Sequence, residues 1–423
     1  MKNAVSILIL LLLCGSVSSQ KDNISAAKGA SVSYQLPDVF KAPGGKAIAK
    51  NHKKWEKKVR PTTLALFEEQ VYGKIPKGLI MTSFRIMEES DATPYANCTR
   101  RQVEMLFEKN GKTLRAEMLM YLPKREEKTP IFIGYNFFGN HTTTTDPEVF
   151  ISESWSRNNA SFGIANNQLS EKNRGVRVNR WPIEEILKSG FGLATIYYGD
   201  IDPDDDDFSN GVHPLLYAEG QTAPRNNEWG AISAWAWALC CAMDYMETDP
   251  NVDAGKVIVM GHSRLGKVAL WAGALDQRFA MVISNESGCG GAALSRRREG
   301  ETVEAINTSF PHWFCTNFKA YNNNEDSLPV DQHQLIAMIA PRPVYIASAQ
   351  EDLWADPFGE YLSGYHASPV YKLFGKIGLT SADMPPVNTP IMNQIGYHIR
   401  TGVHDITLYD WQQFIRFADY HFK

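Results

Sequence analysis

The fold is decided by a stretch near the middle of the chain, Val257-Ile258-Val259-Met260-Gly261-His262-Ser263-Arg264-Leu265-Gly266-Lys267. Its first residues are apolar and mostly β-branched, which indicates a buried strand. Gly261-His262-Ser263 interrupts that run, and residues 267–275 then have the composition of a helix. The stretch therefore predicts a strand, a sharp turn that carries a serine, and a helix whose N-terminus faces the serine hydroxyl.

A serine on such a turn is typical of the nucleophile elbow of α/β-hydrolases. The usual pattern is Gly-x-Ser-x-Gly, whereas this chain has Leu265 in the last position and its glycine one residue later. By itself, the stretch also fits an ordinary serine in a strand–turn–helix. An oxyanion formed at this turn would meet free backbone N–H groups and the positive end of the helix dipole.

Strands and helices alternate on both sides of the elbow. Apolar runs predict strands at residues 130–136, 191–198, 278–284, 344–349 and 395–399, and helices at 60–72, 181–189, 227–248, 332–339 and 409–421. Before them, alternating runs at 83–88, 102–107 and 114–122 predict antiparallel strands, with Asn110-Gly111 as a hairpin turn. This order predicts an α/β-hydrolase three-layer sandwich with a mostly parallel central sheet and antiparallel N-terminal strands.

The N-terminus has the features of a secretory signal. Residues 1–19 combine Lys2 with an apolar core and small residues before a cleavage site near Ser19/Gln20. We therefore expect a secreted or periplasmic protein, and the bulky residue before Cys14 disfavours a lipoprotein anchor. Residues 20–60 are expected to form an extended lead-in, and residues 61–423 a single catalytic domain. The net charge of −4 offers no basic patch for nucleic acid, and no later apolar run is long enough to span a membrane.

A long segment, an acidic run and a pair of cysteines each lead to an expectation. The long segment 142–180 is expected to form part of a cleft wall. The acidic run Asp202–Asp207 could bind a cation, but a solvated acidic loop is the favoured interpretation. Of the five cysteines after the signal, Cys289 and Cys315 are the pair to test for a disulfide.

A serine hydroxyl needs a base, and the base needs an acid that fixes its tautomer. In α/β-hydrolases the chain order is serine, acid, histidine. Ser263 fits the first position, and His404, in a loop after the last predicted strand, fits the base. Asp352 and Glu286 each end a predicted strand, so either or both could be the acid. The loop after the strand at 130–136 should give a second oxyanion N–H, with Phe138-Gly139 as the candidate.

Several motifs together resemble glucuronoyl esterases, carbohydrate esterase family fifteen, and especially the bacterial branch. The elbow Gly261–Lys267 is similar to the family's G-C/H-S-R-x-G-K pattern, which accounts for the displaced glycine. Further matches are Glu286–Gly291, Ala340–Pro343, the Asp352-x-Trp354 pair and Gly402-Val403-His404. The resemblance runs from about Pro61 to the C-terminus.

The resemblance implies roles for individual residues. Ser263 would be the nucleophile, His404 the base, and Glu286 or Asp352 the acid. Arg264 would stand beside the oxyanion, while Lys267, Glu301 and Trp354 would hold the glucuronate ring. Fungal members carry cysteines at the positions of His262 and Asp405, so their disulfide is absent here.

The implied reaction is hydrolysis of (4-O-methyl-)glucuronoyl esters, as in lignin–glucuronoxylan links during lignocellulose degradation, through an acyl-enzyme and with no metal or cofactor. The protein is expected to act as a monomer. One alternative is an acetylxylan or other carbohydrate esterase, which Lys267 and Trp354 disfavour because acetate needs no such contacts. Another alternative is a non-catalytic glycan-binding protein on the same fold, which the complete set of serine, acid and histidine disfavours.

Overall fold

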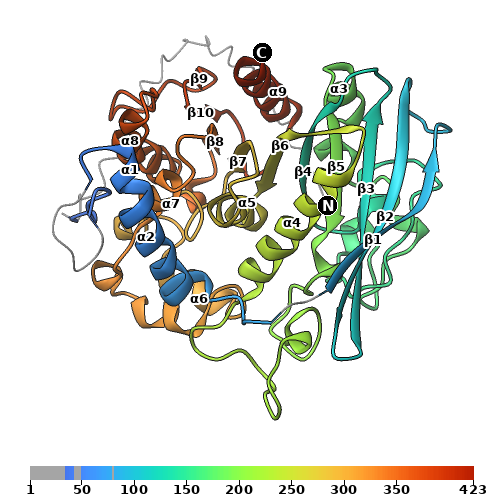
Figure 1. The fold of residues 1–423 in the computed structure, drawn as a ribbon, viewed down its shortest axis with the longest axis horizontal. Coiled ribbons are helices and arrows are strands. Elements are labelled where there is room, and N and C mark those ends of the chain that lie inside the picture. Colours follow the sequence, from blue (N-terminus) through green and yellow to red (C-terminus); the bar gives the residue numbers. More distant parts are fainter. Residues whose placement is uncertain (1–33, 42–48, 79–80) are drawn as a thin grey trace, which may run out of the picture. The chain divides into compact units, whose positions relative to one another are not determined.

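The computed structural model describes residues 34–41, 49–78 and 81–423. In that part of the chain, ten strands form one sheet in the order β1-β2-β3-β5-β4-β6-β7-β8-β10-β9, from the right to the upper left of Figure 1. The strands are β1 (Met81–Ser90), β2 (Cys98–Lys109), β3 (Lys112–Pro123), β4 (Thr129–Asn136), β5 (Gly192–Tyr197), β6 (Val252–His262), β7 (Met281–Asn285), β8 (Val344–Ala349), β9 (Ile391–Met392) and β10 (Ile395–Arg400).

The helices that flank this sheet come mainly from the connections between parallel strands. They are α1 (His52–Lys54), α2 (Arg60–Phe67), α3 (Ile183–Lys188), α4 (Ala231–Thr248), α5 (Arg264–Leu275), α6 (Val303–Ser309), α7 (Gln332–Ala337), α8 (Pro357–Leu373) and α9 (Leu408–Phe422). Among the described residues, no helix combines the length and the apolar composition that a membrane span requires. The predicted signal peptide lies outside the described residues.

Strand directions follow the sequence-based prediction. The pairs β4–β5, β4–β6, β6–β7, β7–β8 and β8–β10 are parallel, whereas β1, β2, β3 and β9 pair antiparallel with their neighbours. Asn110 and Gly111 join β2 to β3 with φ angles of 52° and 77°, the left-handed backbone that a tight hairpin turn requires. The predicted hairpin and the mostly parallel sheet are therefore confirmed.

Both faces of the parallel sheet are covered by helices. In β6, Val257 and Val259 belong to a hydrophobic cluster shared with α4 and α5, and Ile258 and Met260 to a second cluster shared with α3 and α9. The alternation arises because successive side chains of a strand point to opposite faces. The three-layer α/β-hydrolase sandwich is thereby confirmed.

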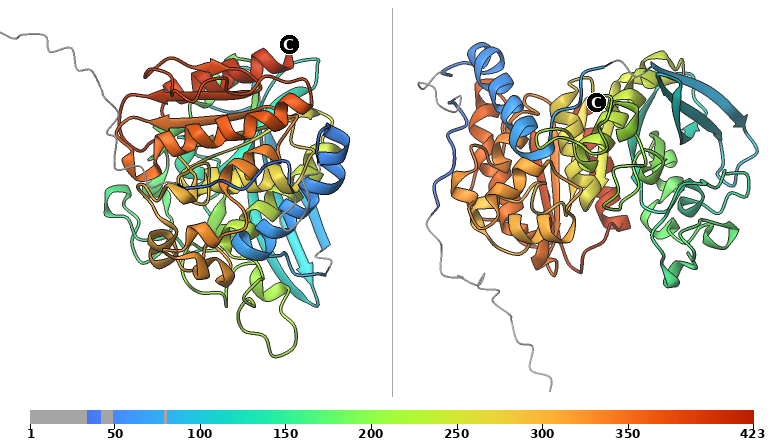
Figure 2. Two further views of the ribbon diagram at one scale, coloured as in Figure 1. Left: turned by 90° about the vertical axis from the view of Figure 1, so that its left-hand side faces the viewer. Right: turned by 90° about the horizontal axis from the view of Figure 1, so that it is seen from below.

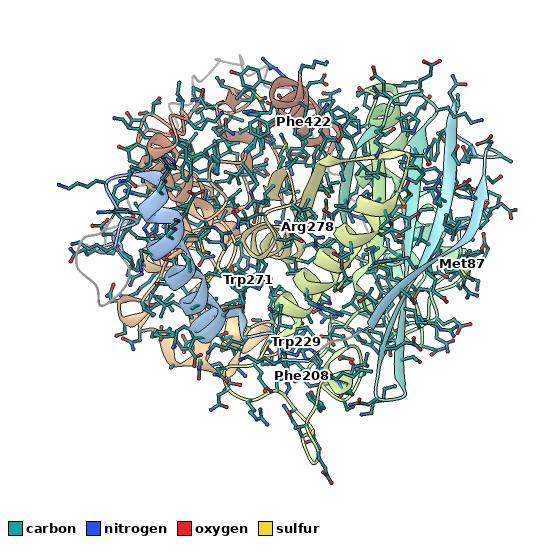
Figure 3. The ribbon with its side chains drawn as sticks, viewed as in Figure 1. Met87, Phe208, Trp229, Trp271, Arg278 and Phe422 are labelled. Carbon is teal, nitrogen blue, oxygen red and sulfur yellow. The ribbon has the colours of Figure 1, made fainter. Side chains whose placement is uncertain are left out.

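Buried hydrogen bonds connect the helices on the face of the sheet that α4 and α5 cover. Trp271 of α5 is fully buried (Figure 3), and its indole N–H donates to Ser233 Oγ of α4 at 3.1 Å. Arg60 at the start of α2 donates to the carbonyls of Ala274 at 2.6 Å and Met338 at 3.0 Å. These bonds explain why α2, blue in Figures 1 and 2, belongs to the folded domain rather than to a loose lead-in.

Two sequence-based expectations are wrong in detail, and one helix was not predicted. Residues 52–59 form α1 and a π-helical turn that continue into α2, so this part of the lead-in is not extended. The helix α8 follows β8 without having been predicted. Cys289 and Cys315 are buried free thiols, so the disulfide is not formed; Cys315 Sγ instead lies 3.8 Å from the carbonyl oxygen of Glu69.

Candidate active site

The serine of the elbow has the backbone conformation that the sequence predicted. Ser263 lies between the end of β6 and the start of α5 with φ 59° and ψ −131°, a region that costs a non-glycine residue free energy. Its N–H donates to the carbonyl of Asn285 at 2.8 Å, which ties the turn to β7. A Cβ on Gly261 would come within 2.0 Å of the carbonyl oxygen of Leu265, so glycine is required there.

The displaced glycine has a packing reason. Gly266 lies on the first turn of α5, where an added Cβ would meet Ser287 Cβ at 3.0 Å and Ser284 Oγ at 3.2 Å. A small residue therefore lets α5 approach the segment that follows β7. Leu265, at the position of the usual glycine, is buried in the core.

A cavity of about 310 Å³ opens at the carboxyl ends of the parallel strands. Open α/β sheets place their active sites at this edge. The structure brings eight of the ten predicted site residues into its lining: Ser263, Arg264, Lys267, Glu286, Glu301, Asp352, Trp354 and His404. These residues come from five separate segments of the chain, which supports a single functional site.

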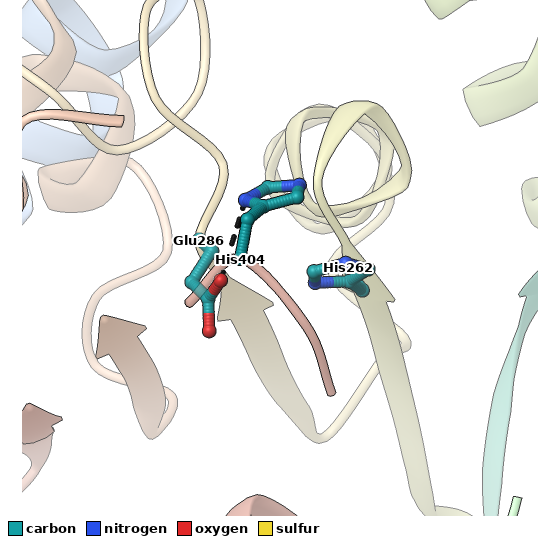
Figure 4. A group of neighbouring side chains, drawn as sticks. All are labelled: His262, Glu286 and His404. Atoms are coloured by element: carbon teal, nitrogen blue, oxygen red, sulfur yellow. Dashed lines mark ion pairs between the residues drawn. The ribbon is translucent and has the colours of Figure 1, made fainter. Parts of the chain in front are cut away.

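His404 is held by two carboxylates. Its Nδ1 lies 2.6 Å from Asp352 Oδ2 and 3.3 Å from Glu286 Oε2, and Figure 4 shows the contact with Glu286. Burial lowers the pKa of His404, but the hydrogen bonds that its Nδ1 donates to Asp352 and Glu286 outweigh burial and raise the pKa to about 9. A proton on Nδ1 leaves Nε2 as the proton acceptor.

Glu286 is more firmly fixed than Asp352. It is fully buried in the left-handed conformation, with φ 48°. Its Oε1 accepts a hydrogen bond from Arg400 Nη2 at 2.6 Å, and its Oε2 accepts the N–H of Asp405 at 2.9 Å. Burial raises the pKa of Glu286 to about 7, against the opposing effects of His404 and Arg400. Of the two carboxylates, Asp352 makes the shorter contact with the imidazole, whereas Glu286 also pairs with Arg400.

His262, Glu286 and His404 have ligand atoms within 4.8 Å of one another, a grouping that could hold a metal ion (Figure 4). Three of the candidate ligand atoms already have partners, however. His262 Nδ1 accepts from the amide of Asn285 at 2.8 Å, His404 Nδ1 faces Asp352, and Glu286 pairs with Arg400. A cation would have to displace these partners, so the donor set does not favour a metal.

The residues expected to hold a sugar form a connected chain. Lys267 is buried, and its Nζ donates to the carbonyls of Ser287 at 2.8 Å and Cys289 at 2.6 Å and to Glu301 Oε2 at 3.0 Å. Glu301 Oε1 accepts the indole N–H of Trp354 at 3.3 Å. Trp354 itself is 56% exposed at the cavity rim. All three ammonium donors of Lys267 are occupied, so it positions Glu301.

Phe138 and Gly139 do not line the cavity. The Phe138 ring packs on Phe162 at 5.1 Å, and Gly139 lies against Leu169 and His141. The neighbouring Phe137 points toward the elbow instead, with its ring 6.2 Å from that of His262 and 5.7 Å from the Arg264 guanidinium carbon. The cavity lining gives the predicted oxyanion pair no support.

Sequence reasoning missed two aromatic residues and one arginine of the site. Phe310 and Trp313 line the cavity from the insertion after β7, a segment whose aromatic content was visible but had no periodic pattern. Arg400 ends β10 four residues before His404 and pairs with Glu286. A charged residue at the end of an apolar strand was the available signal.

The fold and this cavity define a class: an α/β-hydrolase with a serine, a histidine and two carboxylates at the strand ends. Comparison with known proteins narrows the class. A family model described as glucuronyl esterase, fungi, matches residues 204–375. A carbohydrate esterase of an unknown prokaryotic organism is 50% identical over 389 residues, which cover 92% of this chain and 90% of that protein.

Solved structures agree. A promiscuous esterase of carbohydrate esterase family 15 from a marine bacterial metagenome superposes with a TM-score of 0.86 at 49% identity, covering 92% of this chain and 98% of that chain. A glucuronoyl esterase from Solibacter usitatus gives 0.87 at 42%, covering 93% and 99%. The chain belongs to the glucuronoyl esterases of carbohydrate esterase family 15. It is a carboxylic ester hydrolase, and neither sequence-based alternative receives support from these comparisons.

Proposed function

We propose that this protein hydrolyses (4-O-methyl-)glucuronoyl esters, such as those that join lignin to glucuronoxylan, through an acyl-enzyme on Ser263. One observation carries the proposal: Ser263, Arg264 and His404 line the same cavity as Lys267, Glu301 and Trp354. The first group suits acyl transfer. In the second group, Glu301 and Trp354 suit a polar ring that carries hydroxyl groups, and Lys267 positions Glu301. Relatives named 4-O-methyl-glucuronoyl methylesterase, such as one from Wolfiporia cocos that is 36% identical over 197 residues, support the same substrate class.

The reaction would proceed in two steps. Ser263 Oγ attacks the carboxyl carbon while His404 Nε2 takes its proton, and the negative oxygen of the tetrahedral intermediate faces Arg264. The bond to the alcohol then breaks, and the alcohol leaves with the proton from His404. In the second step His404 removes a proton from water, the resulting hydroxide attacks the acyl carbon, and the glucuronic acid departs as Ser263 regains its proton. Asp352, assisted by Glu286, would stabilise the imidazolium in both steps.

The N-terminal sequence bears on the compartment in which the protein acts. We propose that residues 1–19 direct export and that the mature protein acts as a monomer on polysaccharide in the periplasm or outside the cell. The apolar core of the segment and its small residues before Gln20 support this proposal. Mass spectrometry of protein recovered after expression in a bacterial host with an export pathway would test it, with a new N-terminus near Gln20 as the expected result.

Hydrolysis of benzyl glucuronate, acetylated xylan and p-nitrophenyl acetate by the wild type and by Ser263→Ala would test the reaction. We expect turnover that favours the glucuronate ester and falls about a million-fold in the variant. A preference for acetate esters would contradict the acyl specificity. Equal activity of the two proteins would contradict the acyl-enzyme.

A further inference from the structure

We propose that Asp204 is a positioning residue that fixes the Arg264 guanidinium beside the reacting carbonyl, an inference that rests on the proposed function. The acidic run Asp202–Asp207 was expected to be a solvated loop. Instead, Asp202 and Asp204 are buried. The run therefore contributes to the interior of the site, and Asp204 is the member that reaches the elbow.

Four donors from three segments converge on the Asp204 carboxylate. Its Oδ2 contacts Arg264 Nη1 and accepts the hydroxyl of Tyr198 at 3.0 Å. Its Oδ1 lies 2.9 Å from His312 Nε2 and 2.8 Å from the indole nitrogen of Trp313. A carboxylate with this many donors is fixed in direction, and its bond to a guanidinium is charge-assisted.

Asp204 is buried and nevertheless ionised. Its side chain is 1% exposed. Burial by itself would raise the pKa of this carboxyl, but the guanidinium of Arg264 and the hydrogen bonds from His312 and Trp313 bring the pKa well below its ordinary value. A permanent negative charge is therefore buried next to Arg264, behind the cavity wall that Arg264 lines.

Aromatic rings restrict Arg264 further. Its guanidinium carbon lies 4.6 Å from the ring centre of Trp313, 5.3 Å from that of Phe310 and 5.7 Å from that of Phe137. These distances suit cation–π attraction. Because Trp313 also donates to Asp204, one carboxylate orients both the arginine and the ring beside it.

Part of the Arg264 guanidinium remains open to the cavity. Arg264 lines the cavity beside Ser263 with its side chain 20% exposed; among the described residues only its Nη1 has a hydrogen-bond partner, and its Nε is buried. A donor held in place before the reaction stabilises a developing oxyanion without reorganising. In this arrangement Asp204 binds Nη1 and thereby orients the rest of the Arg264 guanidinium toward the carbonyl.

A double-mutant cycle tests whether Asp204 acts through Arg264. The enzymes are the wild type, Asp204→Asn, Arg264→Ala and the double variant, assayed with benzyl glucuronate. We expect Asp204→Asn to lower kcat about 100-fold with little change in KM, since a misplaced catalytic group costs about that much. In the Arg264→Ala background the same substitution should change kcat less than about 3-fold, because its target is gone.

Two further variants complete the design. Asp206→Asn is the matched control, an exposed carboxylate of the same run, and its kcat should equal that of the wild type. Tyr198→Phe removes one hydrogen bond to Asp204 and leaves the Asp204 charge in place. It therefore replaces Asp204→Asn in the cycle if Asp204→Asn does not fold. A roughly 3-fold lower kcat that vanishes in the Arg264→Ala background would support the proposal in that case.

The outcomes separate this inference from the proposed function. Losses that multiply in the double variant would mean that Asp204 supports the fold alone, and the inference would be overturned even though the glucuronate ester is hydrolysed. A wild type that prefers p-nitrophenyl acetate would contradict the substrate assignment. The cycle could then be measured on that ester. If Asp204→Asn caused no additional loss of kcat in the Arg264→Ala background, the result would still support the role of Asp204.

Discussion

His404 Nδ1 and Asp352 Oδ2 are 2.6 Å apart, the shorter of two contacts that the imidazole makes with carboxylates. The other carboxylate, Glu286, lies 3.3 Å away and also accepts from Arg400. A carboxylate that shares its charge with a guanidinium stabilises a neighbouring imidazolium less. From this geometry we propose Asp352 as the principal acid and Glu286 as an assisting one.

Asp352→Asn should lower kcat about 100-fold, and Glu286→Gln only about 10-fold. The reason is that Glu286 remains near His404 when Asp352 is lost, so neither variant falls to the level expected for an enzyme with no acid. Steady-state kinetics with benzyl glucuronate would check this order. A larger loss in Glu286→Gln, or a complete loss in one variant with none in the other, would contradict the shared arrangement.

The pH dependence of the reaction should report the two carboxylates. The base must be neutral, and the pKa of His404 is raised to about 9 because the effects of Asp352 and Glu286 outweigh that of burial. The value of kcat/KM should therefore still be rising well above pH 6.5, reach half of its maximum near pH 9 and level off above that pH. Asp352→Asn removes one stabilising carboxylate, lowers this pKa and moves the rising limb to lower pH. Identical profiles for the two proteins would show that Asp352 does not act on His404.

Lys267 and Glu301 should affect different properties. Lys267→Met leaves two buried carbonyls and Glu301 without their donor. We therefore expect the free energy of unfolding, measured in urea, to fall by about 3 kcal/mol. Glu301→Gln preserves most of these contacts and should raise KM about 10-fold with little change in stability. Lys256→Met is the control, at a partly exposed lysine whose ion pair with Asp253 at 3.6 Å lies at the surface, and it should leave stability nearly unchanged. Equal stability of Lys267→Met and the control would contradict the structural role of Lys267.

Glu360, in α8, should make stability depend on pH. It is fully buried, and its Oε1 accepts from the N–H groups of Ser287 at 2.7 Å and Gly288 at 3.0 Å, while Oε2 accepts from Ser348 Oγ at 2.6 Å. Burial raises its pKa from 4.5 to about 8. The folded state then binds a proton that the unfolded chain releases, so this contribution is complete below pH 4.5 and is lost as pH rises toward 8.

Glu360→Gln can replace all three bonds, because its carbonyl accepts two N–H groups and its amide donates to Ser348. Between pH 5 and pH 8 the variant should gain about 3 kcal/mol relative to the wild type. Urea unfolding at several pH values measures this difference. A wild type and variant whose stabilities change in parallel would refute the raised pKa.

Much of the fold followed from local pattern. The hairpin at Asn110-Gly111 needs only a two-residue turn, and the parallel strands were visible because buried strands are continuous apolar runs. The helix α8 was missed because Pro369 and small polar residues interrupt its pattern. Residues 52–59 are helical because they pack against the domain, a tertiary effect that overrides their polar composition.

The sequence by itself determined the elbow and the family motifs, since each depends on residues close together in the chain. It also determined the order of serine, acid and histidine, which depends only on their positions along the chain. Tertiary structure alone decided which carboxylate lies nearer His404, that Arg400 pairs with Glu286 across 114 positions, and that Asp204 reaches Arg264 across 60. The physical reason is that burial and charge pairing are properties of the folded interior. The same aspartate is a solvated surface group or a fixed anion depending on which distant segments enclose it.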